Sequence, residues 1–528
     1  MFWSDKFQIL VGGLLDITLR LKPYWRFVRL SWYMLKPISK KKWDFNAAAH
    51  LLNRAGFGGA PAEIEHLTKL GPTQAVISFV DYESNTESVT PPEWAKPDPG
   101  RVDRYMEIRK AEPSKRQELI REEQRTQRQH VVELKYWWLK RMAEGPRPLQ
   151  EKMTLFWHGH FATSVEKVKD AYLMWKQNEL FREQATGNWL KLLVAVAKDP
   201  AMLIWLDQAQ SRKEHPNENF AREVMELFTL GEGHYTEKDI TEAARALTGW
   251  TYDRINQQFE ERSRLHDGGS KTVLGKAGDL TGEDVLEQIV AQPQAARFIT
   301  AKIWNFFAGQ MPSEELTTAL ADVFRKSGNN FKPLLKTIFL SEEFYAETIV
   351  RNQVKSPVQW LVGSVRILQR ELPPPFVCFG LTKNLGQDLF QPPNVKGWDG
   401  GLSWITTNNL LARYNEAAVL VQGDLSMVRG INLAANPNAG GAAGKGFMDR
   451  MANMKLRPVD AEKLLSAEER ASKEKLVAAL EKRLLQTRLR GKQEATLKDY
   501  LDGQATLDDS VILNTIRLIM STPEYQLT

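Results

Sequence analysis

The amino-acid sequence predicts an all-α fold, a large multi-helix assembly of helical hairpins with little or no β-structure. Three observations support this prediction: beyond residue 43 apolar residues recur at helical spacing, strand-like alternation is scarce, and helix start and stop signals recur. The 528 residues, 42% hydrophobic and 26% charged, suffice for a large core and exclude a disordered or collagen-like chain. The single cysteine, Cys378, excludes an internal disulfide.

Proline and glycine delimit the first predicted helices. Pro61 fits a first helical turn, and Gly71-Pro72 is a strong stop signal. Residues 83–100 are rich in proline and polar side chains, which is typical of a linker. We therefore expect short helices at 61–70 and 73–81, a linker at 83–100 and a long charged helix at 115–143.

A capping box marks the start of a further helix. The Thr236 hydroxyl can accept a hydrogen bond from the Asp239 amide, and the Asp239 carboxylate can reach back to the Thr236 amide. Tyr235 and Ile240 stand at the flanking positions of a hydrophobic staple. This pattern predicts a helix that begins at Thr236 and ends at Gly249.

The remaining pattern divides the chain into four parts. Residues 283–345 have the spacing of successive short helices, and Ser356-Pro357 starts another. The predicted parts are a basic aromatic amphipathic segment at 1–43, a main helical domain at 44–428, a Gly/Ala-rich linker or loop at 429–450, and a C-terminal helical segment at 451–528 that packs on the main domain.

The net charge of +6 is concentrated at one end of the chain. Residues 1–42 hold nine basic and two acidic side chains, whereas the other 486 residues hold 62 basic and 63 acidic ones. A basic protein suggests a polyanionic partner, but the body of this one is neutral. Because no nucleic-acid recognition motif is visible either, we expect no nucleic-acid binding.

The basic segment has the composition of a helix that lies in a membrane interface, with aromatic rings at the headgroup level and cations toward anionic lipid. Its longest uncharged run, Phe7–Leu15, has nine residues, whereas crossing a membrane needs about 20. The alternative is an amphipathic helix that packs on the body or binds a partner. The residues predicted to contact an anionic membrane surface are Arg20, Lys22, Trp25, Arg26, Arg29 and Trp32.

His158 and His160 form the one His-x-His pair of the sequence. They follow an apolar run, so we expect them to straddle a helix C-terminus with Gly159 as the residue that ends the helix. Two imidazoles at such a turn can bind a divalent metal ion. They can equally satisfy the last carbonyls of the helix and its negative dipole end.

Glu223 lies beside a predicted apolar stripe. At 100° per residue Phe220, Val224, Leu227 and Phe228 share one helix face, and Glu223 falls at its edge. A carboxylate there must be paired, hydrogen-bonded or metal-bound, because burying it alone is costly. Two interpretations follow, an ion pair with a residue such as Arg245, or a functional carboxylate.

His266 and Asp267 lie in a polar loop that also contains Ser270 and Lys271. This loop lacks the spacing of a phosphate-binding Walker loop, and the usual motifs of metalloproteases, serine hydrolases and dinucleotide-binding enzymes are absent from the sequence. If a divalent metal ion were bound, its predicted ligands would be His158, His160, His234, His266 and Asp267, with Glu223 as a catalytic ligand or general base.

Several segments in chain order resemble the domain of unknown function 1800 (DUF1800) family. The most specific is the block from Asn219 to Trp250, which contains Ala-Arg-Glu-Val-Met-Glu-Leu-Phe. The other matching stretches are His50–Gly58, Phe156–Ser164, His266-Asp267, Lys271-Thr272, the helix from Gln292 to Lys302, Pro392–Trp398 and Ser521–Gln526.

This resemblance implies a bacterial protein, commonly of the cell envelope, often encoded beside a DUF1501 protein similar to alkaline-phosphatase-type enzymes. It implies no activity and no catalytic residue. We therefore expect a membrane-associated accessory or scaffold factor that works with an envelope partner, on the cytoplasmic or the periplasmic side. The alternative is a metal-dependent hydrolase with a His/carboxylate site.

Overall fold

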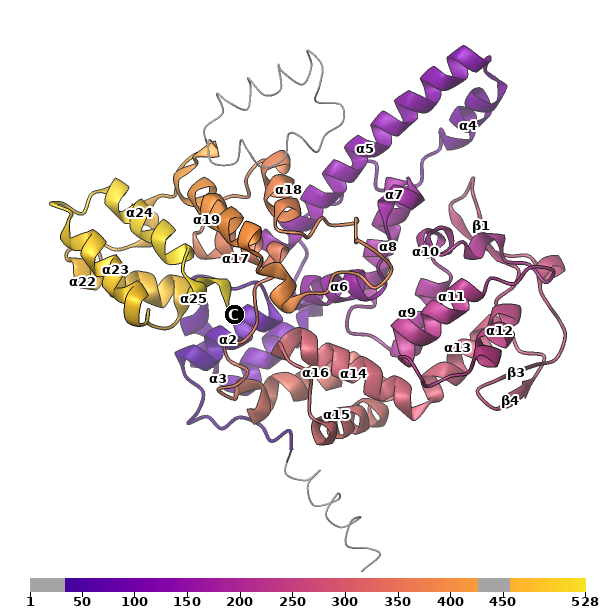
Figure 1. The fold of residues 1–528 in the computed structure, drawn as a ribbon, viewed down its shortest axis with the longest axis horizontal. Coiled ribbons are helices and arrows are strands. Elements are labelled where there is room, and N and C mark those ends of the chain that lie inside the picture. Colours follow the sequence, from indigo (N-terminus) through magenta and orange to yellow (C-terminus); the bar gives the residue numbers. More distant parts are fainter. Residues whose placement is uncertain (1–33, 426–455) are drawn as a thin grey trace, which may run out of the picture.

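The computed structural model describes residues 34–425 and 456–528, and in this part of the chain the all-α prediction is confirmed (Figure 1). The β-structure there consists of two small antiparallel sheets of two strands each. The predicted linker at 429–450 falls outside the described residues, as do the six predicted membrane-contacting residues of the basic segment.

The first helices follow the proline and glycine signals. The predicted pair at 61–70 and 73–81 forms α3, which kinks at Gly71, where φ is +77°. The predicted helix at 115–143 is α5, which forms with α4 a hairpin that projects from the body (Figure 1). The bounds are α2 Phe45–Ala55, α3 Pro61–Val80, the short η1 Tyr82–Ser84, α4 Arg101–Lys110 and α5 Pro113–Glu144.

The middle of the chain alternates short helices with turns. The capping box at Thr236 is confirmed, with the hydroxyl accepting from the Asp239 amide at the start of α12. The bounds are α6 Pro148–His160, α7 Val165–Val168, α8 Ala171–Glu183, α9 Trp189–Ala197, α10 Pro200–Trp205, η2 Gln208–Gln210, α11 Glu218–Glu223, the π-helix η3 Val224–Thr229, and α12 Glu237–Ala246.

Two β-hairpins follow α12. Strands β1 Trp250–Asp253 and β2 Gln258–Glu261 pair with Trp250 opposite Glu261. Strands β3 Lys271–Val273 and β4 Lys276–Gly278 pair with Lys271 opposite Gly278. The short η4 Ser263–Leu265 lies between the hairpins, so the predicted polar loop at His266 and Asp267 connects β2 to β3.

The succession of short helices predicted for 283–345 is confirmed, and so is the helix that starts at Ser356-Pro357. The remaining bounds are α13 Gly282–Ala291, α14 Pro293–Ala308, α15 Glu314–Lys326, α16 Phe331–Leu340, η5 Glu342–Tyr345, α17 Pro357–Ile367, α18 Pro375–Asn384, η6 Gly401–Trp404, α19 Thr407–Gln422, α21 Ala461–Leu464, α22 Lys473–Leu480, η8 Glu481–Leu485, α23 Gly491–Asp502, α24 Asp509–Met520 and α25 Pro523–Gln526.

The buried apolar side chains form two clusters. One joins α2, α3, α6 and α9 to the helices from α11 to α16, with Trp157, Trp189 and Trp304 among its members. The other joins α5 to α17, α19 and the C-terminal helices, with Trp138 and Trp360 among its members. Helix α24 packs on α19, and α6 contributes residues to both clusters, so it links the two halves of the core.

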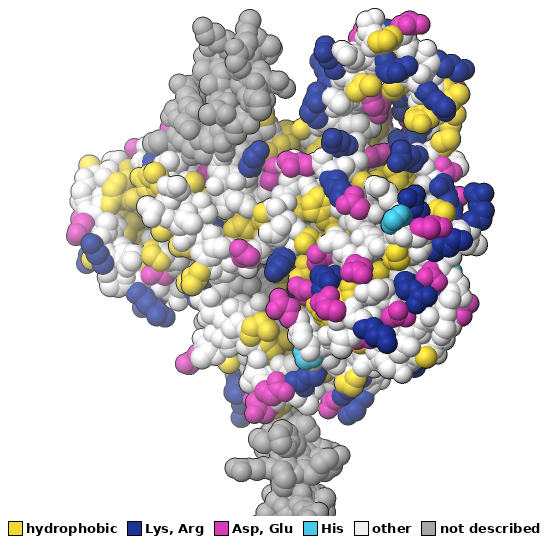
Figure 2. All heavy atoms as spheres, turned by 45° about the vertical axis from the view of Figure 1, so that its right-hand side comes forward, with side chains coloured by type: hydrophobic (Ala, Val, Ile, Leu, Met, Phe, Trp, Pro, Cys, Tyr) yellow, Lys and Arg dark blue, Asp and Glu magenta, His cyan; other side chains and the backbone are white. Residues whose placement is uncertain are grey.

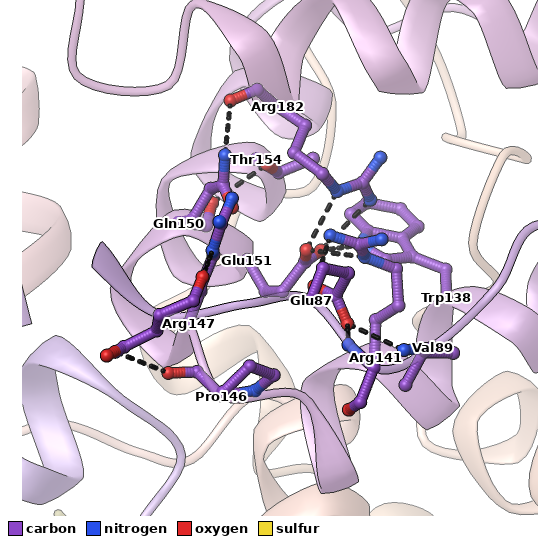
Figure 3. Close-up of polar contacts among 12 residues, drawn as sticks. Glu87, Val89, Trp138, Arg141, Pro146, Arg147, Gln150, Glu151, Thr154 and Arg182 are labelled. Carbon is purple, nitrogen blue, oxygen red and sulfur yellow. Dashed lines mark hydrogen bonds and ion pairs between the residues drawn. The ribbon is translucent and has the colours of Figure 1, made fainter. Parts of the chain in front are cut away.

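A buried carboxylate holds α6 against its neighbours (Figure 3). Glu151 accepts hydrogen bonds from Trp138 Nε1 at 2.9 Å, from Arg141 Nε at 2.8 Å, and from Arg182 Nε at 2.7 Å. Burial raises the pKa of Glu151, but the charges and hydrogen bonds of Arg182 and Arg141 outweigh it and hold this pKa below its usual value. Helices α5, α6 and α8 are thus joined at one ionised group.

Arg54, near the end of α2, connects distant parts of the chain. Its guanidinium donates to the carbonyls of Phe307 at 2.8 Å and Ile349 at 2.9 Å, and to Thr528 O at 2.6 Å. It also donates to the side chains of Asn352 and Gln353. Since a planar fork of N–H donors is needed for such a set, the position requires arginine.

The end of the predicted basic segment packs on the body. Ile38 and Trp43 are buried, the Ile38 amide donates to Leu340 O at 2.7 Å, and Trp43 Nε1 donates to Leu67 O at 3.2 Å. Residues 34–43 therefore belong structurally to the body. Acidic and basic side chains are interspersed over the face shown in Figure 2, which agrees with the neutral charge of the body.

Candidate functional site

A cavity of about 540 Å³ lies between α6, α14 and the loop at residues 394–404. We call it the α6–α14 cavity. The segment from Asn352 to Gln359, which leads into α17, supplies a further wall. Its volume is in the range of small-molecule binding sites. Three of the segments that resemble the DUF1800 family, around His158, Lys302 and Trp398, meet here.

The close approach of two backbones fixes one side of this cavity. A Cβ on Gly397 would lie 2.3 Å from Gly159 O, and Gly397 has φ +80°, so both sterics and conformation require glycine. Gly159 lies inside α6, which continues to His160. The prediction that Gly159 ends the helix is therefore wrong, because Phe161 closes the last turn by donating its amide to Trp157 O.

His160 lines the cavity, and only one of its two ring nitrogens is hydrogen-bonded. Its Nε2 lies 3.0 Å from Phe228 O and must donate to it, so Nδ1 of the neutral ring is an acceptor. This Nδ1 is buried and has no hydrogen-bond partner among the described residues. Burial, together with the charge of Lys302, lowers the pKa of His160 well below its usual value.

The carbonyls that hold His160 and Lys302 come from the π-helix η3. Lys302 Nζ donates to Leu227 O at 3.4 Å, next to the Phe228 carbonyl that His160 uses. A π-turn displaces carbonyls from the regular helical pattern, and such turns are frequent at functional sites. Burial lowers the pKa of Lys302 to about 8.

Lys152 is the most deeply buried cation of the cavity wall, with 3% of its surface exposed. Its Nζ lies 4.8 Å from the centre of the Phe57 ring and has no hydrogen-bond partner among the described residues. Burial, together with the charge of Arg54, lowers the pKa of Lys152 to about 7. The wall also contains the exposed Lys396 and Asp399. Together with Lys152 and Lys302 it therefore carries three lysines and one aspartate.

His158 packs against Trp398, a residue of the cavity wall. Its Nε2 accepts the Phe390 amide at 3.0 Å, and its ring lies 5.6 Å from that of Trp398. Burial, together with the charge of Lys135, lowers the pKa of His158 to about 3. A neutral acceptor that receives a backbone amide has a structural role, but this role differs from the predicted capping of the last helix carbonyls, because the partner of Nε2 is an amide from another segment.

The buried state of His158 predicts a pH-dependent stability. Because its folded pKa lies near 3 and an unfolded histidine titrates near 6.5, its contribution is complete above pH 6.5 and falls as the pH drops toward 3. His158→Gln keeps an acceptor but does not titrate. Between pH 6 and 4 the unfolding free energy of this variant should depend less on pH than that of the wild type, by about 1.4 kcal/mol per pH unit. Urea unfolding at several pH values measures this, and equal slopes would contradict it.

Glu223 is half-buried and is not among the residues that line the cavity. Burial and the charge of Glu226 raise its pKa, while the charge of Lys396 opposes them, which places it near that lysine. The predicted apolar face is only partly correct. The helix α11 changes into the π-helix η3 directly after Glu223. As a result Met225 is buried, whereas Leu227, which was predicted to be buried, is only half-buried. The predicted pairing with Arg245 is wrong, because Arg245 forms ion pairs with other carboxylates.

Arg245 instead pairs with Asp267, at 2.7 Å, and with Glu242, at 3.1 Å. His266 Nδ1 lies 3.0 Å from Thr248 O, and His234 is exposed in the turn before α12. Within residues 34–425 and 456–528 no group of three or more His, Cys, Asp or Glu side chains lies close enough to hold a metal ion. The five predicted ligands and Glu223 are therefore not gathered into a metal centre, and the geometry gives the metal-dependent hydrolase no support.

Lys152 is not among the residues predicted for the site, and Lys302 was predicted only as the end of a helix. In both cases the sequence contains a signal, a lysine surrounded by apolar residues of a helix. Lys152 follows Leu149 and precedes Met153 and Leu155, and Lys302 lies between Ile299 and Ile303. A lysine among core positions of a helix is rare and is therefore a sign of function.

Comparison with known proteins identifies a family. The family model described as "Protein of unknown function (DUF1800)" matches residues 50–527. No curated protein and no solved structure matches the chain. Among the helices of the described residues, none is both long enough and apolar enough to span a membrane.

Proposed function

The chain belongs to the DUF1800 family, and because that membership assigns no activity, we propose a function from the α6–α14 cavity: the protein binds a small anionic ligand there. One observation carries this proposal. Lys152 lines the cavity, and its buried Nζ has no hydrogen-bond partner among the described residues. A buried ammonium without a partner is costly, whereas an anion in the cavity would satisfy it.

The surrounding charges favour the same class of ligand. Lys302 and Lys396 face the cavity with Lys152, and Asp399 is the one carboxylate of the described wall. The other charged or titratable groups close to these lysines are His160 on α6, Arg54 on α2 and Glu223 on α11. Three cations against one carboxylate complement a carboxylate or phosphate group.

Lys302→Gln tests the proposal. We expect the wild-type protein to bind acetate or inorganic phosphate in isothermal titration, and the variant to bind about tenfold more weakly, since a charge-assisted hydrogen bond contributes about 1.5–3 kcal/mol. Lys482→Gln removes the same charge at a half-exposed lysine that pairs with Glu65 and should leave the affinity unchanged. The two probes separate carboxylate from phosphate recognition, and no binding of either, or equal loss in both variants, would contradict the proposal.

The affinity should also decrease as the pH rises. Lys152 and Lys302 have pKa values lowered to about 7 and about 8, so both lose their charge between pH 6 and 9, where ordinary lysines stay protonated. Anion binding measured across this range should weaken with increasing pH in the wild type. The remaining pH dependence of Lys302→Gln should be smaller.

The N-terminal segment supports a location at a membrane surface for this ligand-binding accessory protein. Residues 1–42 carry seven net positive charges. Ile38, in the last part of this segment, and Trp43, directly after it, are hydrogen-bonded to the body, so the end of the segment is attached at a defined place. A DUF1501 protein remains the predicted partner.

Sedimentation with vesicles tests the membrane proposal. The full chain should bind vesicles of phosphatidylcholine and phosphatidylglycerol, and Lys22→Glu/Arg26→Glu/Arg29→Glu should lose most of this binding, since each cation near an anionic surface contributes about 1 kcal/mol. Vesicles of phosphatidylcholine alone are the control. Equal sedimentation of both proteins would contradict attachment through these cations, and no sedimentation of the wild type would contradict membrane attachment itself. Both outcomes would leave the anion-binding proposal untouched.

A further inference from the structure

The polar groups of the α6–α14 cavity point to a particular class of anion. We propose that its ligand is an acidic sugar, a polyhydroxylated ring that carries one carboxylate or phosphate group. This inference rests on the proposed anion binding and adds the part of the ligand that is not charged. It depends on side chains other than the lysines.

Two glutamines of the cavity wall are held in place by hydrogen bonds. Gln359 donates Nε2 to Asn53 O at 3.1 Å, which leaves its Oε1 as an acceptor. Gln387 accepts the Val358 amide at 3.0 Å through Oε1, which leaves its Nε2 as a donor. Both amides are thereby oriented before any ligand binds. Sugar hydroxyls, each of them a donor and an acceptor, match such a pair.

His160 adds a further acceptor. Because Nε2 carries the proton that is donated to Phe228 O, the buried Nδ1 can act only as a hydrogen-bond acceptor. A carboxylate offers no hydrogen to it, whereas a hydroxyl does. Because His160 lines the cavity, a ligand hydroxyl that reaches Nδ1 would satisfy this acceptor, whereas acetate would leave it without a partner, and an unsatisfied buried acceptor costs about 1–3 kcal/mol.

Aromatic rings complete the wall. Trp398 is half-buried between Gly397, which packs on Gly159, and the exposed Asp399, and its ring contacts that of His158 at 5.6 Å. Trp404 and Phe156 line the same cavity. Flat apolar rings with polar groups around them suit a ligand that has C–H faces and hydroxyl edges, as a pyranose has.

Isothermal titration of the full chain with five probes tests the inference. The probes are D-glucuronate, D-glucose 6-phosphate, D-glucose, acetate and inorganic phosphate. We expect one acidic sugar to bind at least about tenfold more tightly than glucose and than the corresponding simple anion. Glucuronate and glucose 6-phosphate distinguish a carboxylate from a phosphate as the acidic group.

Each other outcome has a defined meaning. If acetate or phosphate binds as tightly as the acidic sugars, anion binding stands and the sugar inference is overturned. If glucose binds as tightly as glucuronate, the acidic group is not recognised, and the anion proposal fails with it. If no probe binds, both are overturned.

Trp398→Leu separates the two kinds of recognition within the site. The variant should lose about tenfold more affinity for the acidic sugar than for acetate or phosphate, because the lysines are unchanged. Lys302→Gln should weaken both. The comparison among probes on the wild-type protein does not depend on how well either variant folds.

Discussion

Glu151→Ala should lower the free energy of unfolding by about 3–5 kcal/mol, as expected for removal of one partner from a buried ion pair. The substitution leaves Arg141 and Arg182 buried without the carboxylate that neutralises them, and it also removes the acceptor of Trp138 Nε1. The side chain of Glu151 is only 1% exposed, so water cannot replace the lost contacts. Urea unfolding followed by circular dichroism measures the effect.

Two comparison variants assign this loss to the buried charge. Glu151→Gln keeps the shape and two acceptor lone pairs but not the charge, and should fall between the wild type and Glu151→Ala. Glu65→Ala removes a carboxylate that pairs with Lys482 at the surface, where both side chains are about half exposed, and should cost less than about 1 kcal/mol. A loss below 1 kcal/mol for Glu151→Ala would show that the network does not stabilise the fold.

Arg54→Leu should be comparably destabilising, by about 3–5 kcal/mol. The substitution leaves the carbonyls of Phe307 and Ile349 without their donor in a buried place, at about 1–3 kcal/mol each. It also releases Asn352 and Gln353, which line the α6–α14 cavity. We therefore expect a lower unfolding midpoint in urea and, under conditions where the variant is folded, weaker binding of the anionic probe.

The geometry of the arginine fork supplies the control. Arg54→Lys keeps the charge but cannot bond several groups at once, so it should recover only a small part of the lost stability. Arg222→Leu removes an arginine that pairs with Glu237 near the surface and should have an effect below about 1 kcal/mol. If Arg54→Lys restored full stability, charge rather than hydrogen-bond geometry would explain the role of the residue.

Elements that depend on local chemistry could be predicted from the sequence. The Thr236 hydroxyl and the Asp239 carboxylate lie three residues apart and cap α12 whatever surrounds them. Gly71 kinks α3 because a positive φ there costs glycine little. The same reasoning fails at η3, where a π-turn changes the angle per residue and moves Met225 into the core.

The candidate site could be predicted only in part. His160 and Glu223 were recognised by residue type; His160 lines the cavity, and Glu223 lies near Lys396 of the cavity wall. His234, His266 and Asp267 were chosen on the same grounds, but Asp267 neutralises Arg245 and the two histidines lie elsewhere. Residue type alone cannot show which polar groups meet, because that depends on contacts between distant segments.

The hydrogen bond from the Phe390 amide to His158 joins positions 232 residues apart. Contacts of such long sequence separation form late in folding, because the entropy of closing the intervening loop must be overcome first. The helices on either side can reach native secondary structure before the cavity between them exists. Refolding followed by a bound probe should therefore lag behind refolding followed by circular dichroism, and a ligand that binds only the completed cavity would slow unfolding more than it speeds folding.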